Sequence, residues 1–311
     1  MTMRIAVLGA GGVGGYFGGR LAEAGYDVRF VARGEQLAAL RRDGLAVESV
    51  AGDFTVGSVV ASDDPAEIGA VDYVLLGVKT WQLDAAVRTL KPLIGEGTAV
   101  ITTQNGVEAP RQVADVVGQG AVLPGAVEII AFLDGPGRVR HIGGLGKLTF
   151  GEWDNRTSER VERLRDALQA SKLTAVVPDD VWVALWSKFL ALGSFGAVAT
   201  LADAPFGVLR SRPGTRQLIV DSMNEIRQVA KATGVELPAD AVDNTLAFLD
   251  SLPEAGTTSL QRDIKAGRPS ELEAWTGAVV RLGRQTGTPT PLNNLLYELA
   301  SARSQAGTQT D

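Results

Sequence analysis

Three glycines near the start of the sequence have the spacing of a phosphate-binding loop. Gly9, Gly11 and Gly14 form the pattern G-x-G-x-x-G directly after an apolar run at 5–8. In this pattern the first glycine permits a tight turn, the second lets backbone approach a pyrophosphate, and the third lets a helix pack closely on the preceding strand. The unpaired N–H groups at the start of that helix attract phosphates without a basic side chain. The spacing therefore predicts a dinucleotide-binding loop.

The residues around this loop supply the context that the motif needs. A strand at 4–8, a helix from about Val13 to Ala24 and a second strand at 27–32 form one βαβ unit within about 30 residues. The competing interpretation is a secretory signal, with Arg4 as its basic residue. Interleaved glycines would break the short helix that a signal requires, so we favour the βαβ unit, and the absence of an export signal predicts a cytoplasmic protein.

The residue that would meet the adenosine ribose is Arg33, nineteen positions after Gly14. Sites for NAD place an acid here to bind two hydroxyls, whereas arginine complements a 2′-phosphate. Glu35 is the competing acid, and we interpret it as a favourable charge in the first turn of a helix that begins at Gly34. The cofactor is therefore predicted to be NADP, bound as NADPH.

Two further polar residues follow successive predicted strands. Lys79 comes after the apolar strand at 71–78, and Asn105 comes after the strand at 99–103. Ligands of an open α/β sheet bind outside the carboxyl ends of its strands. A loop lysine is commonly a solvated charge and Asn-Gly is commonly a turn. Because both residues fall at this edge, we predict that they contact cofactor or substrate.

Lys188 is unusual because it interrupts the apolar run from Val181 to Phe195. Burying an ammonium group without a partner is costly, so this lysine either reaches water or faces a ligand. Four further polar residues lie on either side of a predicted helix break at Gly267. They are Ser259, Asp263, Arg268 and Glu271. These are the candidate reactive groups beyond the glycine loop.

The composition excludes several kinds of chemistry. The chain of 311 residues has no cysteine and one histidine, His141, so no metal site is expected and a histidine triad has one candidate base. We interpret His141 as a strand residue with satisfied hydrogen bonds. Lysine or a carboxylate must then carry any acid–base step. The net charge of −6 argues against a nucleic-acid partner, and no continuous apolar run is long enough for a membrane span.

The pattern of elements predicts two domains, 1–178 and 179–311. Short β segments alternate with helices up to Pro178, and those at 121–151 are expected to extend the first sheet. Beyond Pro178 the sequence predicts only helices, at about 181–195, 209–233, 239–251, 258–266, 269–286 and 291–302. The fold class is thus an α/β Rossmann-type N-terminal domain followed by an all-α C-terminal domain.

These motifs, in this order, resemble the ketopantoate reductase family (2-dehydropantoate 2-reductase). The residues that carry the resemblance are the glycine loop, Arg33, Val78-Lys79-Thr80, Gln104-Asn105-Gly106, Trp186-Ser187-Lys188, Ser259 with Asp263, and the run Gly267-Arg268-Pro269-Ser270-Glu271. The resemblance implies an NADP-binding domain joined to a helical domain like that of 6-phosphogluconate dehydrogenase, with the active site in the cleft between them. It further implies NADPH-dependent reduction of a small 2-keto acid in pantothenate biosynthesis.

The resemblance also implies a role for each site residue. Lys188 corresponds to the catalytic lysine and Glu271 to a supporting carboxylate that orients the lysine or a substrate hydroxyl. Asn105 corresponds to an asparagine that bridges cofactor and substrate, Lys79 to a lysine beside the cofactor, and Ser259 to a contact of the substrate carboxylate.

Three positions depart from the family pattern. Leu192, Gly196 and Thr276 stand where family members that act on ketopantoate commonly carry asparagine. An apolar Leu192 would suit a bulkier or less hydroxylated 2-keto acid. Two other functions therefore stay open: an NADP-dependent 2-hydroxyacid dehydrogenase acting on another substrate, and a non-catalytic NADP-binding sensor. The sequence does not decide the oligomeric state, for which a homodimer is one candidate.

Overall fold

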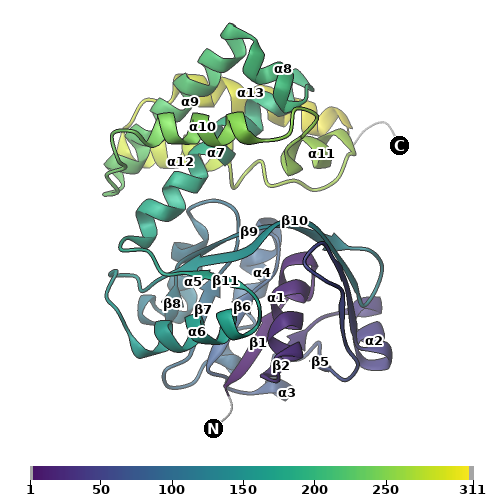
Figure 1. Cartoon of the computed structure of the whole chain (residues 1–311). Helices are drawn as coiled ribbons and strands as arrows, with labels where there is room; N and C mark the ends of the chain where they lie inside the picture. The colour runs from purple at the N-terminus through teal and green to yellow at the C-terminus, as the bar shows by residue number, and fades with distance from the viewer. Residues whose placement is uncertain (1–2, 308–311) are drawn as a thin grey trace. The chain divides into compact units, whose positions relative to one another are not determined.

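The computed structural model describes residues 3–307, with side chains up to 305, and contains two compact units (Figure 1). The sheet unit comprises the described residues of Met1–Gln104 together with Ala109–Val181. The helical unit comprises Asn105–Glu108 together with the described residues of Trp182–Asp311. The chain thus crosses between the units after Gln104, after Glu108 and after Val181. A boundary between separately folding domains at 178 stays a prediction.

The first sheet of the sheet unit is parallel throughout and has six strands in the order β5-β2-β1-β6-β7-β8. Counted along the chain, the order is third, second, first, fourth, fifth, sixth, which is that of a doubly wound dinucleotide-binding sheet. The predicted α/β Rossmann-type fold is therefore confirmed. The strands are β1 (Arg4–Leu8), β2 (Asp27–Val31), β5 (Val60–Ser62), β6 (Tyr73–Leu76), β7 (Ala99–Thr102) and β8 (Val122–Leu123).

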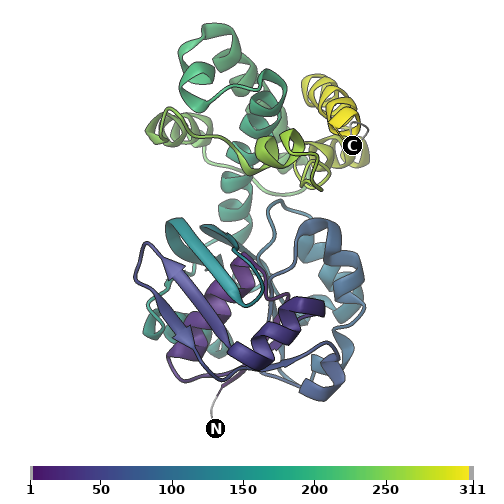
Figure 2. The same cartoon turned by 90° about the vertical axis from the view of Figure 1, so that its right-hand side faces the viewer.

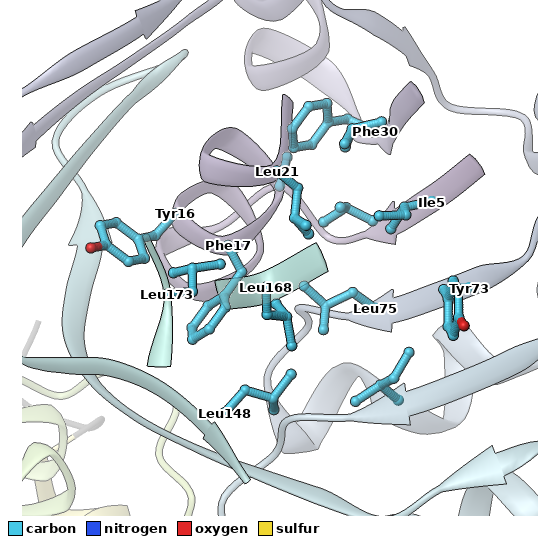
Figure 3. Packing of buried hydrophobic residues seen from close by; sticks show 14 of the residues in the cluster. Ile5, Tyr16, Phe17, Leu21, Phe30, Tyr73, Leu75, Leu148, Leu168 and Leu173 are labelled. Carbon is cyan, nitrogen blue, oxygen red and sulfur yellow. The ribbon is translucent and has the colours of Figure 1, made fainter. Parts of the chain in front are cut away.

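Helices cover both faces of this sheet, which is why its central strands are apolar without alternation. Ile5 and Val7 of β1 enter one hydrophobic cluster, whereas Ala6 and Leu8 enter another on the opposite face. Figure 3 shows the first of these clusters, where Ile5 and Leu75 pack near residues of α1. The helices of the unit are α1 (Gly12–Glu23), α2 (Gly34–Asp43), α3 (Pro65–Ile68), α4 (Leu83–Val87), α5 (Ala109–Val117) and α6 (Glu159–Ala170).

A second sheet lies on the other side of α1, and its existence corrects one prediction. Only β8 of the segment 121–151 extends the first sheet. The rest forms the antiparallel pair β9 (Gly125–Leu133) and β10 (Arg138–Phe150), which joins β3 (Leu45–Ser49), β4 (Phe54–Val56) and β11 (Thr174–Val176). The backbone of β10 pairs with β3, β9 and β11, so β10 belongs to the second sheet and does not extend the first.

Glycines allow α1 to fit between the two sheets (Figure 2). A Cβ added at Gly18 would lie 2.7 Å from Val7 of the first sheet, and one at Gly15 would lie 2.7 Å from Val139 of the second. These distances are shorter than normal carbon–carbon contacts. The glycine-rich sequence of α1 therefore serves packing on both sides as well as the phosphate loop.

The helical unit contains the predicted helices, with some boundaries corrected. The first of them, expected at about 181–195, continues to Ala202. The segment expected at 209–233 is broken at Arg212, because Pro213 begins a new helix where its missing N–H is tolerated. The helix expected from 269 begins at Thr276, after a turn at 271–275. The helices are α7 (Val181–Ala202), α8 (Phe206–Ser211), α9 (Pro213–Ala232), α10 (Ala241–Ser251), α11 (Ser259–Lys265), α12 (Thr276–Thr286) and α13 (Pro291–Gly307).

The helix α7 carries Lys188 and is both long and apolar. By length and composition alone it could cross a membrane, although 61% of its most apolar window is buried inside the protein. Trp186, Phe189 and Leu190 belong to the core of the helical unit. The apolar character of α7 is accordingly that of a central core helix.

Candidate active site

The glycine loop has the geometry that its spacing predicts. Gly9 has φ +99°, and a Cβ there would lie 2.7 Å from a methyl carbon of Val78. A Cβ at Gly14 would lie 2.1 Å from the carbonyl oxygen of Gly9, so only glycine allows α1 to approach β1 this closely. At Gly11 the nearest atom would be 3.8 Å away, which leaves the backbone open on that side. The N-terminus of α1 and this open backbone fit a pyrophosphate group.

Gln36 supports the loop, although the sequence gives no sign of this role. Its Nε2 donates a hydrogen bond to the carbonyl oxygen of Ala10 (2.8 Å), and its Oε1 accepts one from the backbone of Gly137 (2.8 Å). Gln36 therefore ties the glycine loop to the start of β10. No local pattern signals this role, because the two partners lie in distant parts of the sequence.

Arg33 lies at the N-cap of α2, at the carboxyl end of β2. Its side chain is exposed and forms no hydrogen bond or ion pair with the described residues. Glu35 is exposed in the first turn of α2, as interpreted from the sequence. The guanidinium group of Arg33 is therefore accessible to an anionic group.

The loops after β6 and β7 are joined by a buried glutamine. Nε2 of Gln104 donates to the carbonyl oxygens of Leu76 (2.8 Å) and Val78 (2.9 Å). Lys79 follows directly, with its side chain exposed and its ammonium group 5.8 Å from the ring centre of Trp81. Gln104 thus sets the backbone that carries Lys79. Asn105, the next residue along the chain, belongs to the helical unit.

Three predicted residues meet within the helical unit. Nζ of Lys188 donates a hydrogen bond to Oδ1 of Asn105 (2.9 Å), and Nδ2 of Asn105 donates one to Oε2 of Glu271 (2.9 Å). The orientation of the amide follows from its neighbours, since an ammonium group only donates and a carboxylate only accepts. Glu271 is 5% exposed, and the other two residues are half-buried. The amide thereby links a cation to an anion in a fixed order.

The remaining polar residues near Gly267 take different roles. Gly267 follows the C-cap of α11 with φ +63°, and Arg268 forms an ion pair with Asp263 (2.8 Å). Ser259, the first residue of α11, is half-buried and its hydroxyl has no hydrogen bond to the described residues. Of the four polar residues predicted around Gly267, Glu271 is thus the one whose side chain bonds Asn105, which in turn bonds Lys188.

The positions that depart from the family pattern are apolar or buried. Leu192 lies one turn after Lys188 and packs against the core of the helical unit. Gly196 is buried one turn further on. The Thr276 hydroxyl is buried with no hydrogen-bond partner among the described residues. No asparagine amide is present at these positions to bind a hydroxyl group.

His141 is occupied elsewhere, as interpreted from the sequence. The buried ring lies 2.8 Å from Oγ of Ser49 through Nδ1 and 3.0 Å from the Gly143 carbonyl oxygen through Nε2. Within 3–305, no three His, Cys, Asp or Glu side chains are grouped so that they could hold a metal ion.

The chain is similar to known proteins over most of its length. The family model described as "Ketopantoate reductase PanE/ApbA" matches residues 5–155, and its C-terminal model matches residues 180–304. A 2-dehydropantoate 2-reductase of Mesorhizobium japonicum is 33% identical, over 93% of this chain and 94% of that protein.

Solved structures resemble the chain over nearly its full length. The PanE/ApbA family ketopantoate reductase of Ralstonia eutropha JMP134 has a TM-score of 0.89 at 30% identity and covers 99% of this chain and 100% of its own. A D-mandelate dehydrogenase, solved with NADH and anilino(oxo)acetate, has a TM-score of 0.87 at 25% identity, with coverages of 98% and 99%. The likeness thus includes both units of the chain.

Proposed function

Because this chain belongs to the ketopantoate reductase family and is an oxidoreductase acting on CH–OH groups, we propose that it reduces a 2-keto acid to a 2-hydroxy acid with NADPH. Its first candidate substrate is 2-dehydropantoate (ketopantoate), with pantoate as product. The observation that carries the proposal is the hydrogen-bonded row of Lys188, Asn105 and Glu271.

The cofactor would be held by the sheet unit. The backbone at Gly9, Gly11 and Gly14 would bind the pyrophosphate, the exposed Arg33 would bind the 2′-phosphate, and Lys79 would lie beside the cofactor. Asn105 would contact both cofactor and substrate. Bound NADPH supplies the hydride. The open backbone at Gly11 and the free guanidinium group support this assignment.

The helical unit would supply the proton and the electrostatic stabilisation. Negative charge develops on the carbonyl oxygen during reduction, and the Lys188 ammonium group would stabilise it and then donate a proton from Nζ. Lys188 becomes neutral in this step and regains a proton from water. Asn105 would hold Nζ in one direction, and Glu271 would keep the amide from turning. Ser259, whose hydroxyl has no partner among the described residues, would bind the substrate carboxylate.

A second candidate is oxidation of another 2-hydroxy acid with NADP. It is favoured by the apolar Leu192 and by the likeness to a D-mandelate dehydrogenase. A non-catalytic NADP sensor is the third candidate, and it would retain its function without Lys188. We further propose a cytoplasmic location and a role in pantothenate biosynthesis, and a homodimer can be tested by light scattering.

A steady-state screen tests the main proposal. Purified protein would be supplied with NADPH and, in turn, ketopantoate, trimethylpyruvate and phenylglyoxylate, and NADPH oxidation would be followed by absorbance. We expect at least one 2-keto acid to be reduced with NADPH preferred over NADH. Tight NADPH binding with no turnover of any 2-keto acid or 2-hydroxy acid would refute the enzyme and favour the sensor.

A further inference from the structure

The segment Asn105–Glu108 is anchored to the helical unit at every residue. It follows β7 of the sheet unit, yet Val107 is buried in the hydrophobic core of the helical unit. Gly106 has φ +114°, and a Cβ there would lie 2.8 Å from the carbonyl oxygen of Ala274. Asn105 itself bonds Lys188 and Glu271. Asn105 is therefore held by a four-residue segment that packs within the helical unit.

Glu108 makes the polar anchor of this segment. Its carboxylate accepts hydrogen bonds from Nη2 (2.7 Å) and Nε (3.5 Å) of Arg281, so the guanidinium group faces both oxygens. A planar guanidinium group that bonds both carboxylate oxygens fixes the direction of the Glu108 side chain as well as its distance. The single ammonium group of a lysine would not do so. The ion pair consequently restrains the backbone three residues after Asn105.

Arg281 also holds the turn that carries Glu271. Its Nη1 donates to Oε2 of Glu273 (3.0 Å) and its Nη2 to the carbonyl oxygen of Glu273 (2.6 Å). The Tyr297 hydroxyl donates to the other Glu273 oxygen (2.6 Å). One guanidinium group thus bonds two separate segments, one that contains Asn105 and one that contains Glu271.

From these contacts we infer that Arg281 is a positioning residue for the reaction. It sets the distance between the segment of Asn105 and the turn of Glu271, and Asn105 in turn sets the direction of Lys188. The inference rests on the proposed function of Lys188, Asn105 and Glu271. Arg281 forms no hydrogen bond to any of these three side chains, so its effect is exerted through Glu108 and Glu273.

The helical unit offers a matched control for this role. Arg216 of α9 and Asp250 of α10 form a two-point ion pair at 2.7 and 2.8 Å, with side chains 37% and 44% exposed. The corresponding exposures are 40% for Arg281 and 19% for Glu108. Half-exposed ion pairs contribute little to folding stability. Because Glu108 is less exposed than Asp250 and Arg281 also bonds Glu273, Arg281→Met should lower the melting temperature somewhat more than Arg216→Met. Only Arg281→Met should impair catalysis.

The first experiment measures kcat, KM and melting temperature for both variants. Displacement of a reacting group by about 1 Å can cost about 100-fold in rate. We expect Arg281→Met to lower kcat roughly 10- to 100-fold with NADPH affinity unchanged, whereas Arg216→Met keeps the wild-type kcat. Arg281→Lys retains the positive charge but not the two-point hydrogen bonding, so it should recover only part of the rate. Equal kcat values in Arg281→Met and Arg216→Met would overturn the inference.

The second experiment tests whether Arg281 acts through Asn105. In a background of Asn105→Ala, the change Arg281→Met should cost little further rate, because the group that it positions is already absent. If the rate losses of the two single variants multiplied fully in the double variant, Arg281 would act independently of Asn105. That result would contradict the inference.

A readout that needs no turnover separates this inference from the proposed function. The NMR signal of the Lys188 ε-methylene, assigned by its loss in Lys188→Arg, should shift in Arg281→Met and in Asn105→Ala but not in Arg216→Met. An unchanged signal in Arg281→Met would refute the positioning role. Failure of the wild-type protein to reduce any 2-keto acid would instead refute the proposed function.

Discussion

Gly196 lies against the indole ring of Trp275 so closely that a Cβ at 196 would be 2.6 Å from Cε3 and 2.7 Å from Cζ3. Trp275 is fully buried, and Gly196 lies two turns after Lys188 on α7. An asparagine at 196 would therefore have to displace the indole ring. Together with Leu192, this arrangement makes the face of α7 that follows Lys188 apolar. If this face contacts the substrate, we expect it to suit a 2-keto acid with fewer hydroxyl groups than ketopantoate, as in the second candidate function.

The side chain at 192 should change substrate preference. Trimethylpyruvate differs from ketopantoate by the absence of one hydroxyl group, so the ratio of their kcat/KM values reports recognition of that group. One added hydrogen bond contributes about 0.5–1.5 kcal/mol, and Leu192→Asn should move the ratio toward ketopantoate by roughly 2- to 10-fold. Gly196→Asn serves as a contrast, because it should lower the melting temperature without this gain. An unchanged ratio in Leu192→Asn would place the substrate elsewhere.

Removal of the Lys188 ammonium group should abolish most turnover. Proton transfer by a positioned side chain contributes about 10²- to 10⁴-fold, so Lys188→Met should lower kcat within that range. Isothermal titration should show that NADPH still binds, because the proposed phosphate contacts lie in the sheet unit. Retained turnover in this variant would favour another proton donor.

Arg33 should select between the two nicotinamide cofactors. Hydrogen bonds to a charged group contribute about 1.5–3 kcal/mol, so Arg33→Ala should weaken NADPH binding by roughly 10- to 100-fold. The affinity for NADH, which has no 2′-phosphate, should change little. Fluorescence titration with both cofactors measures the two effects, and equal losses would argue against a phosphate contact at Arg33.

The ion pair at the start of α6 should make stability depend on pH. Glu152 is partly buried and accepts hydrogen bonds from Nε (2.7 Å) and Nη2 (2.5 Å) of Arg160 and from Oγ of Ser158 (2.5 Å). Burial acts to raise the pKa of Glu152, but the hydrogen bonds from Arg160 and Ser158 hold it below its ordinary value. The carboxylate therefore stabilises the fold above the unfolded pKa of about 4.3, and this contribution is lost as the pH falls through the folded pKa.

The corresponding variant is Glu152→Gln. It should lower the free energy of unfolding at neutral pH by about 1–2 kcal/mol, and its difference from the wild type should disappear in acid. Urea denaturation across this pH range measures both effects. Glu162→Gln is the control, because its ion pair with Arg165 is more exposed and should contribute little at any pH. A difference between Glu152→Gln and wild type that does not vary with pH would contradict the assignment.

Metal removal should leave activity unchanged. The proposed electrostatic stabilisation comes from an ammonium group, and the described residues contain no cluster of three metal ligands. Dialysis against a chelator followed by the NADPH oxidation assay checks this. Loss of activity that a divalent cation restores would contradict a metal-free reaction.

Local patterns alone determined much of this protein. The glycine spacing predicts the loop at Gly9–Gly14 because turn, phosphate approach and helix packing involve neighbouring residues. The continuous apolar strands and the switch to helices after Pro178 are likewise local in origin. His141 was interpreted correctly as a satisfied strand residue, since its alternating surroundings already indicate a strand.

Only the tertiary structure decided the strand order, the second sheet and the grouping of the site residues. Asn105 is 83 residues from Lys188 and 166 from Glu271, and Glu108 is 173 residues from Arg281. Contacts at such separations depend on how whole elements pack, which the type and spacing of neighbouring residues do not encode. For this reason the sequence could nominate Lys188, Asn105 and Glu271 separately, whereas their hydrogen-bonded order and the role of Arg281 follow from the packing of the helical unit.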